Sequence, residues 1–234
     1  MSTKLVVDSA NQLKELSDSE SFQHPYFIRL AAKIISYVFH PIFVPVYIVL
    51  FLLYISSGVF AGVNDWNKKV VLMQAVLMYS FFPLVTVLLL KALKFVDSVF
   101  LDTQRDRIIP FVVCIIWYFW ICYVWNNLPG YPKEIVVLAA AIFLAAWIGL
   151  MANIYMKISM HMIAMGVATG FLMLLGFKQS SGFGLYIAVT LLVTGLVATS
   201  RFIISDHKPK EIYGGLFAGI AALVVAELLR GIFY

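Results

Sequence analysis

The stretch VVLAAAIFLAAWIGLMANIY, residues 136–155, decides the class of fold. It is apolar and uncharged, and it has the length of about 20 residues that a helix needs to cross a bilayer. A second run, YIAVTLLVTGLVAT at 186–199, repeats the pattern. Neither run alternates apolar and polar residues as the strands of a transmembrane barrel do. The sequence therefore predicts an all-α integral membrane protein, a polytopic helical bundle.

The composition of the whole chain supports this prediction. Of the 234 residues, 62% are hydrophobic and 12% are charged, whereas soluble domains are about 45–50% apolar and about 25% charged. The net charge of +5 fits anionic headgroups or an anionic lipid substrate. Basic patches interleaved with aromatic residues are missing outside the apolar runs, so we expect no nucleic-acid partner. Cys114 and Cys122 have no partner at metal-ligand spacing, and we expect no metal and no cofactor.

The chain divides into a polar N-terminal tail, 1–26, and a membrane domain, 27–234, with about six or seven transmembrane helices. Pro41 and Pro45 predict a kink in the first span or an interfacial helix before it. The candidate spans are 33–57, 70–93, 108–126, 134–155, 159–176, 183–203 and 210–232.

The alternation of the spans sorts the loops onto two faces. The tail and loops 94–107, 156–158 and 204–209 share one face, and these three loops carry nearly all the unusual polar residues. Three segments that are distant in sequence thus bring Arg, His, Ser and Glu to one side of the membrane. Ionisable groups near membrane depth are costly and usually functional.

The segment SRFIISDHKPKEIYGG, residues 200–215, has the richest chemistry. Pro209 suits the first turn of a helix, so Glu211 lies in that turn, four residues after His207. A carboxylate there can hold the imidazole in one tautomer and leave the other ring nitrogen free to attack or to accept a proton. Arg201 offers a planar fork of donors that suits a phosphate. A snorkelling arginine followed by a capped turn explains this segment equally well when it is taken alone.

Two further segments add cations and a second imidazole. In KISMHMIAMG, residues 157–166, Ser159 and His161 stand at a helix start, where free N–H groups favour anions, and Lys157 adds charge. In LDTQRDRIIPF, residues 101–111, Arg105 and Arg107 precede the next span. Each segment alone also fits ordinary helix capping or a charge cluster that flanks a span. Their coincidence on one face predicts a phosphate pocket.

These segments resemble the three motifs of the type 2 phosphatidic acid phosphatase superfamily, which includes lipid phosphate phosphatases and vanadium haloperoxidases. Residues 200–211 read S-R-x5-H-x3-E, similar to the third motif, S-R-x5-H-x3-D. Residues 158–161, I-S-M-H, resemble the second motif, P-S-G-H, and residues 105–110 resemble the first, K-x6-R-P. The resemblance covers about 94–230.

The resemblance implies metal-free hydrolysis of a phosphorylated lipid through a phosphohistidine. His207 would attack phosphorus, Glu211 would orient His207, and His161 would protonate the leaving alkoxide. The phosphate oxygens would be held by Arg201, Arg107, Arg105 and Ser159. We expect membrane lipids as further partners and a multi-pass location in the bacterial cytoplasmic membrane. Positive-inside counting would place the site in the cytoplasm, whereas many members of the superfamily act on the outer face.

The differences from the motifs leave two other functions open. Glu211 replaces Asp, Ile158 and Met160 replace Pro and Gly, and Phe100 stands where the first motif has Lys. A catalytically impaired relative that binds phosphorylated headgroups is therefore the first alternative. The second is a membrane prenyltransferase, because Asp102 and Asp106 form a D-x-x-x-D pattern that can hold magnesium.

Two pairs in the last span predict packing rather than chemistry. Gly215 and Gly219 form a G-x-x-x-G pattern, which is typical of close helix packing. Glu227 and Arg230 are three residues apart, a spacing that lets them pair on one helix face.

Overall fold

The structure is a computed structural model of the chain. It describes residues 4–7, 13–16, 24–56, 58–95, 104–178, 182–205 and 207–231, and for the first two ranges and Arg105 it describes the backbone alone. Two short strands, β1 (Lys4–Val7) and β2 (Leu13–Leu16), pair antiparallel within the predicted tail. Every other regular element in the described ranges is a helix.

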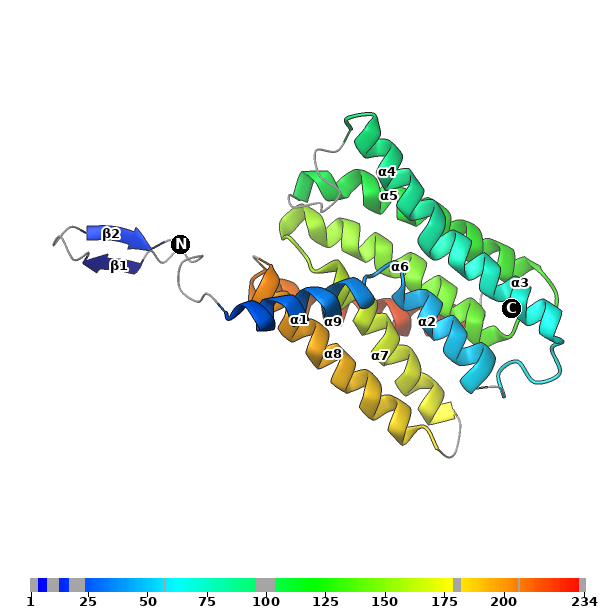
Figure 1. The fold of residues 1–234 in the computed structure, drawn as a ribbon. Coiled ribbons are helices and arrows are strands. Elements are labelled where there is room, and N and C mark those ends of the chain that lie inside the picture. Colours follow the sequence, from blue (N-terminus) through cyan, green and yellow to red (C-terminus); the bar gives the residue numbers. More distant parts are fainter. Residues whose placement is uncertain are drawn as a thin grey trace.

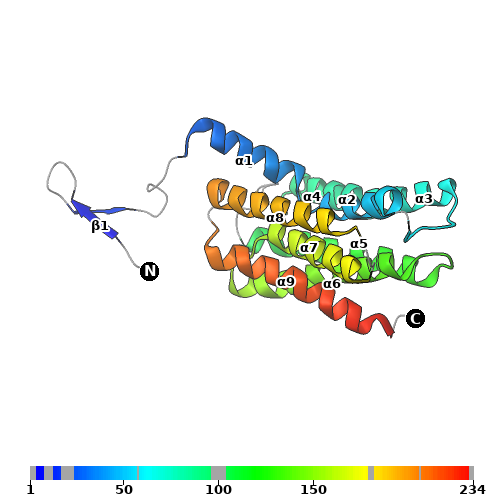
Figure 2. The same cartoon turned by 90° about the horizontal axis from the view of Figure 1, so that it is seen from below.

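Six helical segments among the described residues are long and apolar enough to cross a membrane. They lie side by side in a bundle (Figures 1 and 2), which confirms the predicted fold class. The first segment joins α3 (Asp65–Ala75), the π-helical η2 (Val76–Phe81) and α4 (Phe82–Ala92). The others are α5 (Gln104–Asn127), α6 (Lys133–Tyr155), α7 (Met160–Lys178), α8 (Gly184–Ile204) and α9 (Pro209–Leu228), which continues into the 3-10 turn η3 (Leu229–Gly231).

Prolines set several boundaries of these helices. Pro132 directly precedes α6, and Pro209 is the first residue of α9, positions where a missing N–H leaves no helical hydrogen bond unmade. Pro83 follows the π-helical η2, and helices commonly change their hydrogen-bond register next to a proline.

The expected span over 33–57 does not form as one helix, and the chain breaks beside Pro41, one of the two prolines that predicted a kink or a preceding interfacial helix. The chain forms α1 (Tyr26–Val38), a turn over 39–43, and α2 (Val44–Leu50) with the π-helical continuation η1 (Phe51–Ile55). Pro41 explains the break, because proline has no N–H and disfavours helical backbone at the residue before it, His40. The helix over Val44–Ile55 is apolar but much shorter than the ~20 residues of a span. Helix α1 packs against α8 as a separate element (Figure 2).

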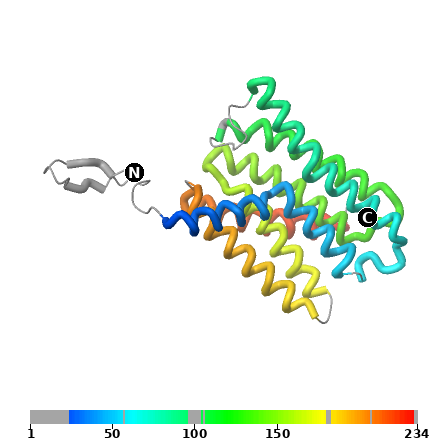
Figure 3. Tube along the Cα trace, in the orientation of Figure 1, coloured from blue at the N-terminus to red at the C-terminus, as the bar shows by residue number. Residues whose placement is uncertain are grey.

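The two sets of connections lie at opposite ends of the bundle, as the alternation of spans predicts. The α6–α7 and α8–α9 connections share one end, where α5 begins (Figure 3). We call this end the polar end, because it carries the candidate site residues. At the other end Glu227 accepts hydrogen bonds from Arg230 at 3.2 Å and from Lys178 at 2.6 Å, which confirms the predicted Glu227–Arg230 pair.

Helices α7 and α9 pack with backbones in contact. The Gly219 Cα lies beside Gly166, so close that a Cβ added to Gly219 would be 2.9 Å from the Gly166 Cα and would collide with the Ile163 carbonyl oxygen. Gly215 faces the Ser159 carbonyl oxygen in the same way. Small residues permit such close approach between helices in a membrane. The G-x-x-x-G pattern therefore serves packing inside the chain and fixes the start of α9 against the start of α7.

We expect Gly219→Ala to destabilise the protein by about 1–3 kcal/mol or more, because the methyl group has no space to enter. Gly195→Ala on α8 is the matched control, since nothing lies within 4 Å of the Cβ position there. Thermal unfolding of the detergent-solubilised variants measures the difference. Equal melting temperatures for the two variants would contradict this description of the α7–α9 contact.

Candidate functional site

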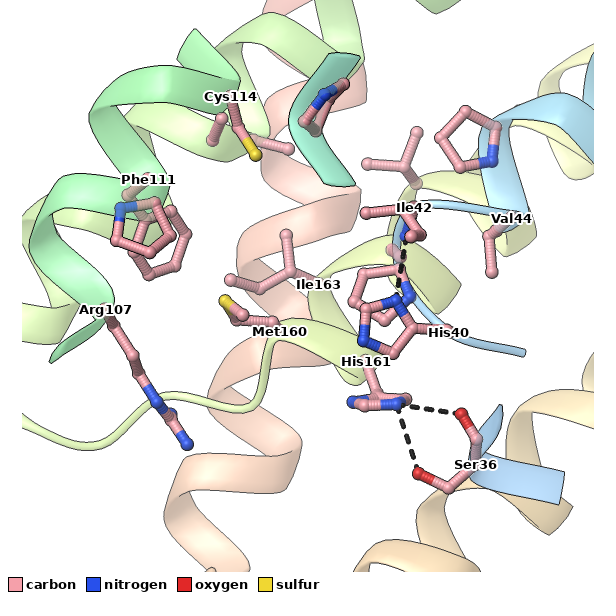
Figure 4. A pocket seen from close by; sticks show the side chains of 18 of the residues that line it. Ser36, His40, Ile42, Val44, Arg107, Phe111, Cys114, Met160, His161 and Ile163 are labelled. Carbon is pink, nitrogen blue, oxygen red and sulfur yellow. Dashed lines mark hydrogen bonds between the residues drawn. The ribbon is translucent and has the colours of Figure 1, made fainter. Parts of the chain in front are cut away.

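A cavity of about 560 Å³ opens at the polar end between α1, α2, α4, α5, α6, α7 and α8. Its two ends differ in chemistry (Figure 4): Arg107, His161 and Ser36 lie toward one end, and Cys114 and Val44 toward the other. The cationic and imidazole side chains that line it are Lys33, His40, Arg107, Lys157, His161, Arg201 and His207. The aliphatic lining includes Val44, Ile48, Leu84, Val87, Ile142, Ala145 and Ala146.

His207 and Glu211 form the pair that their spacing predicts. The Nδ1 of His207 lies 3.1 Å from Glu211 Oε2, and both side chains are buried. The same carboxylate oxygen accepts the Lys208 N–H at 3.1 Å. Because a carboxylate only accepts, Nδ1 carries the proton and donates. The Nε2 of a neutral His207 therefore has an unshared electron pair.

His207 is held neutral by its surroundings. Burial lowers its pKa below the usual 6.5, and the positive charges of Arg201 and Arg107 lower it further, against the opposing effect of Glu211. At neutral pH the imidazole is therefore uncharged, the state in which its nitrogen can attack.

Two guanidinium groups flank this imidazole from different helices. Arg107, near the start of α5, is buried and donates from Nη1 to the Ile158 carbonyl oxygen at 3.0 Å. Arg201, near the end of α8, donates from Nη1 to Ser36 Oγ at 3.0 Å. The Nε of Arg201 is buried and finds no hydrogen-bond partner among the described residues. An unpaired buried donor of this kind is unusual inside a protein.

The α6–α7 connection brings the second imidazole to the same cavity. The Ser159 N–H donates to the Glu211 carbonyl oxygen at 3.1 Å, which ties the start of α7 to the start of α9. The Nε2 of His161 lies 3.1 Å from both the carbonyl oxygen and the Oγ of Ser36. Since a carbonyl oxygen only accepts, this Nε2 carries a proton and donates.

The structure gathers most of the predicted site residues around one space. Arg107, Lys157, His161, Arg201 and His207 line the cavity, and Glu211 stands behind His207. Ser159 is fully buried and does not line the cavity, and its Oγ has no partner among the described residues. The side chain of Arg105 and all of Asp102 lie outside the described residues. Met160 lines the cavity where the resembled motif has glycine.

Four polar lining residues come from α1 and the turn after it, and they were not predicted as part of the site because this segment lies outside the resemblance. They are Lys33, Ser36, Tyr37 and His40. Lys33, Ser36 and Tyr37 are spaced three and four residues apart, which places them on one face of α1, and His40 follows in the turn. The helical spacing was the signal available in the sequence. His40 packs edge-to-face on His161 with ring centroids 5.3 Å apart. Burial, assisted by the charge of Arg201, lowers the pKa of His40 to about 4, so this ring is neutral at pH 7.

Glu211→Gln should slow turnover by roughly tenfold, because the amide keeps an acceptor for Nδ1–H but loses the charge that strengthens the bond. Glu211 raises the pKa of His207 through its hydrogen bond and charge. Its replacement therefore lowers that pKa further and moves the acid limb of the kcat/KM profile to lower pH. Glu134→Gln, at the other end of the bundle beside Arg230, is the control. An acid limb that moves to higher pH, or stays in place, would disprove this role.

Comparison of the chain with protein-family models, with curated proteins and with solved structures gives no match. A functional interpretation therefore depends on the geometry and chemistry of the cavity. Two features of the cavity support such an interpretation: the hydrogen-bonded His207–Glu211 pair and the cationic side chains that share the cavity with it.

Proposed function

We propose that the protein is an integral-membrane phosphatase that hydrolyses a lipid phosphate or diphosphate through a phosphohistidine intermediate. One observation carries the proposal: Arg107, Lys157, Arg201 and three imidazoles line a single cavity, in which Arg107 and His161 lie toward one end and Val44 and Cys114 toward the other (Figure 4). A phosphorylated lipid has the same division into an anionic head and an apolar chain. The resemblance of the three motifs supports the same reaction.

In the proposed reaction the Nε2 of His207 attacks phosphorus, and the bond from phosphorus to the lipid oxygen breaks. His161, in its imidazolium form, donates its Nε2 proton to that leaving oxygen and becomes neutral. The oxygen departs as an alcohol or, from a diphosphate, as a lipid phosphate. Water then attacks the phosphohistidine with His161 as the base, and inorganic phosphate leaves. Arg201 and Arg107 stabilise the charge that develops on the phosphoryl oxygens. Glu211 keeps the Nδ1 proton of His207 in place.

In this proposal the lipid chain of the substrate stays in an apolar environment during the reaction. The headgroup would enter at the polar end while the chain remains among the apolar side chains, since transferring the chain to water costs about 0.8 kcal/mol for each CH₂ group. The bacterial cytoplasmic membrane is the proposed location, and phosphatidic acid, phosphatidylglycerol phosphate and polyprenyl diphosphate are the substrates to test.

One observation favours the alternative of an impaired relative that binds headgroups. Met160 lines the cavity, and its side chain takes space that glycine would leave for the close approach of a ligand to the backbone. A prenyltransferase depends on Asp102 and Asp106, of which Asp102 lies outside the described residues.

The test is phosphate release from these three lipids by purified protein in lipid nanodiscs, with and without orthovanadate or EDTA. We expect release that vanadate inhibits and EDTA spares. Headgroup binding without release from any of the lipids would favour the impaired relative. Loss of activity in EDTA would count against the metal-free reaction and favour a magnesium-dependent one.

A further inference from the structure

Ser36 of α1 makes contacts inside the cavity that resemble those of a phosphoryl oxygen. Its Oγ accepts a hydrogen bond from Arg201 Nη1 at 3.0 Å and lies 3.1 Å from His161 Nε2. Its carbonyl oxygen lies 3.1 Å from the same Nε2. One serine thus occupies donors of both the cation and the imidazole that the proposed reaction assigns to the substrate.

We propose that Ser36 holds the position of a phosphoryl oxygen in a closed state of the site, and that α1 is a strap that withdraws when a phosphate binds. The proposal concerns regulation of the site described above and rests on the proposed function in so far as that site must bind phosphate. It does not require that the protein hydrolyse the phosphate.

Helix α1 buries few of its residues, as is expected of an element that can move. Only Ala32 and Ser36 of this helix are buried, and elements with few buried contacts open at low free-energy cost. The rest of its surface is largely apolar and exposed: Phe27 is 79% exposed and Tyr37 is 59% exposed. An apolar face of this kind can remain in lipid while the helix shifts.

The turn over 39–43 provides the place where α1 can pivot. Two hydrogen bonds fix the chain around this turn: Tyr47 Oη donates to the Val38 carbonyl oxygen at 2.9 Å, and Ser80 Oγ donates to the Ile42 carbonyl oxygen at 2.7 Å. Both lie at or beyond the C-terminal end of α1. The contacts of Ser36 are thus the main polar contacts that fasten the body of the helix over the cavity.

Charge explains why phosphate would displace the serine. A hydrogen bond to an ionised oxygen is roughly twice as strong as one between neutral partners, so Arg201 gains by exchanging a hydroxyl for a phosphoryl oxygen. In this description phosphate binds only to molecules in which the strap is open. The apparent affinity for phosphate is therefore the intrinsic affinity multiplied by the open fraction. Loss of the Ser36 hydroxyl removes part of the closing interaction and raises that fraction.

The first test measures binding of orthovanadate and of inorganic phosphate to the purified protein by calorimetry. We expect Ser36→Ala to bind both anions roughly three- to tenfold more tightly than the wild type, and Ser36→Thr, which keeps the hydroxyl, to resemble the wild type. Thr199→Ala is the control, because it removes an exposed hydroxyl of α8 that donates within its own helix. Unchanged or weaker binding by Ser36→Ala would overturn the proposal, since a serine that helps to bind phosphate gives that result.

The second test reads the position of α1 without any turnover. Cys114→Ala and Cys122→Ala remove the native thiols, and Ala32→Cys, at the other buried position of α1, supplies a reporter that leaves Ser36 in place. We expect phosphate to increase maleimide labelling at position 32 severalfold, whereas unchanged or reduced labelling would overturn the strap. Phosphate binding without lipid hydrolysis would contradict the proposed phosphatase activity and would be consistent with the proposed movement of α1. No phosphate binding by any variant would overturn both.

Discussion

Replacing His207 with alanine should abolish turnover, with a loss on the order of 10⁴-fold or more, the scale seen when a nucleophile or its base is removed. Its Nε2 is the ring nitrogen available for attack, because Nδ1 is engaged by the carboxylate. Without this nitrogen no phosphohistidine can form. Phosphate release from the preferred lipid measures the loss.

A second variant separates lost chemistry from lost folding. His207→Ala leaves the buried Glu211 with the Lys208 N–H as its remaining partner, and an uncompensated buried charge can destabilise a protein strongly. His207→Gln keeps a donor for the carboxylate and lacks the nucleophile, so it should melt like the wild type and remain inactive. His24→Ala, outside the cavity lining, should be fully active. Turnover at the wild-type rate in either His207 variant would remove this residue from the reaction.

Arg201→Lys should lower kcat/KM by roughly 10²- to 10³-fold, the effect of losing one preorganised donor to a developing oxyanion. Lysine keeps the charge but not the planar fork that binds two phosphoryl oxygens at once. Orthovanadate should bind the variant more weakly by a comparable factor, because it mimics the crowded phosphorus of the transition state.

Arg230→Lys is the matched control for this prediction. Arg230 pairs with Glu134 and Glu227 at the other end of the bundle, so its replacement should leave kcat/KM nearly unchanged. Similar losses in the two variants would indicate a general effect on folding. A loss below about threefold for Arg201→Lys would show that this guanidinium does not contact the reacting group.

The sequence alone predicted the features that depend on the spacing of residues along the chain. Apolar runs of the length of a bilayer predicted the six spans of the described residues, together with a seventh over 33–57 that is not one helix. The alternation of the runs predicted which loops meet at the polar end. The His207–Glu211 contact follows from a separation of four residues across a helix start. Arg230 likewise reaches Glu227 through one turn of α9.

Features that depend on tertiary contacts were not predictable in this way. Ser36 meets residues that are 125 and 165 positions away in sequence, and no local pattern encodes such pairings. The break between α1 and α2 turned one expected span into two helices, because Pro41 interrupts an apolar run that is otherwise long enough to cross. The pairing of β1 with β2 within the polar tail was also not predicted.

The most direct measurement of the central claim is to quench the reaction during turnover and to locate protein-bound phosphate by mass spectrometry under alkaline conditions, which preserve phosphohistidine. We predict a phosphoryl group on His207 in the wild type and none in His207→Gln. Hydrolysis that proceeds with no phosphoryl group on the protein, or with one on another residue, would contradict the account.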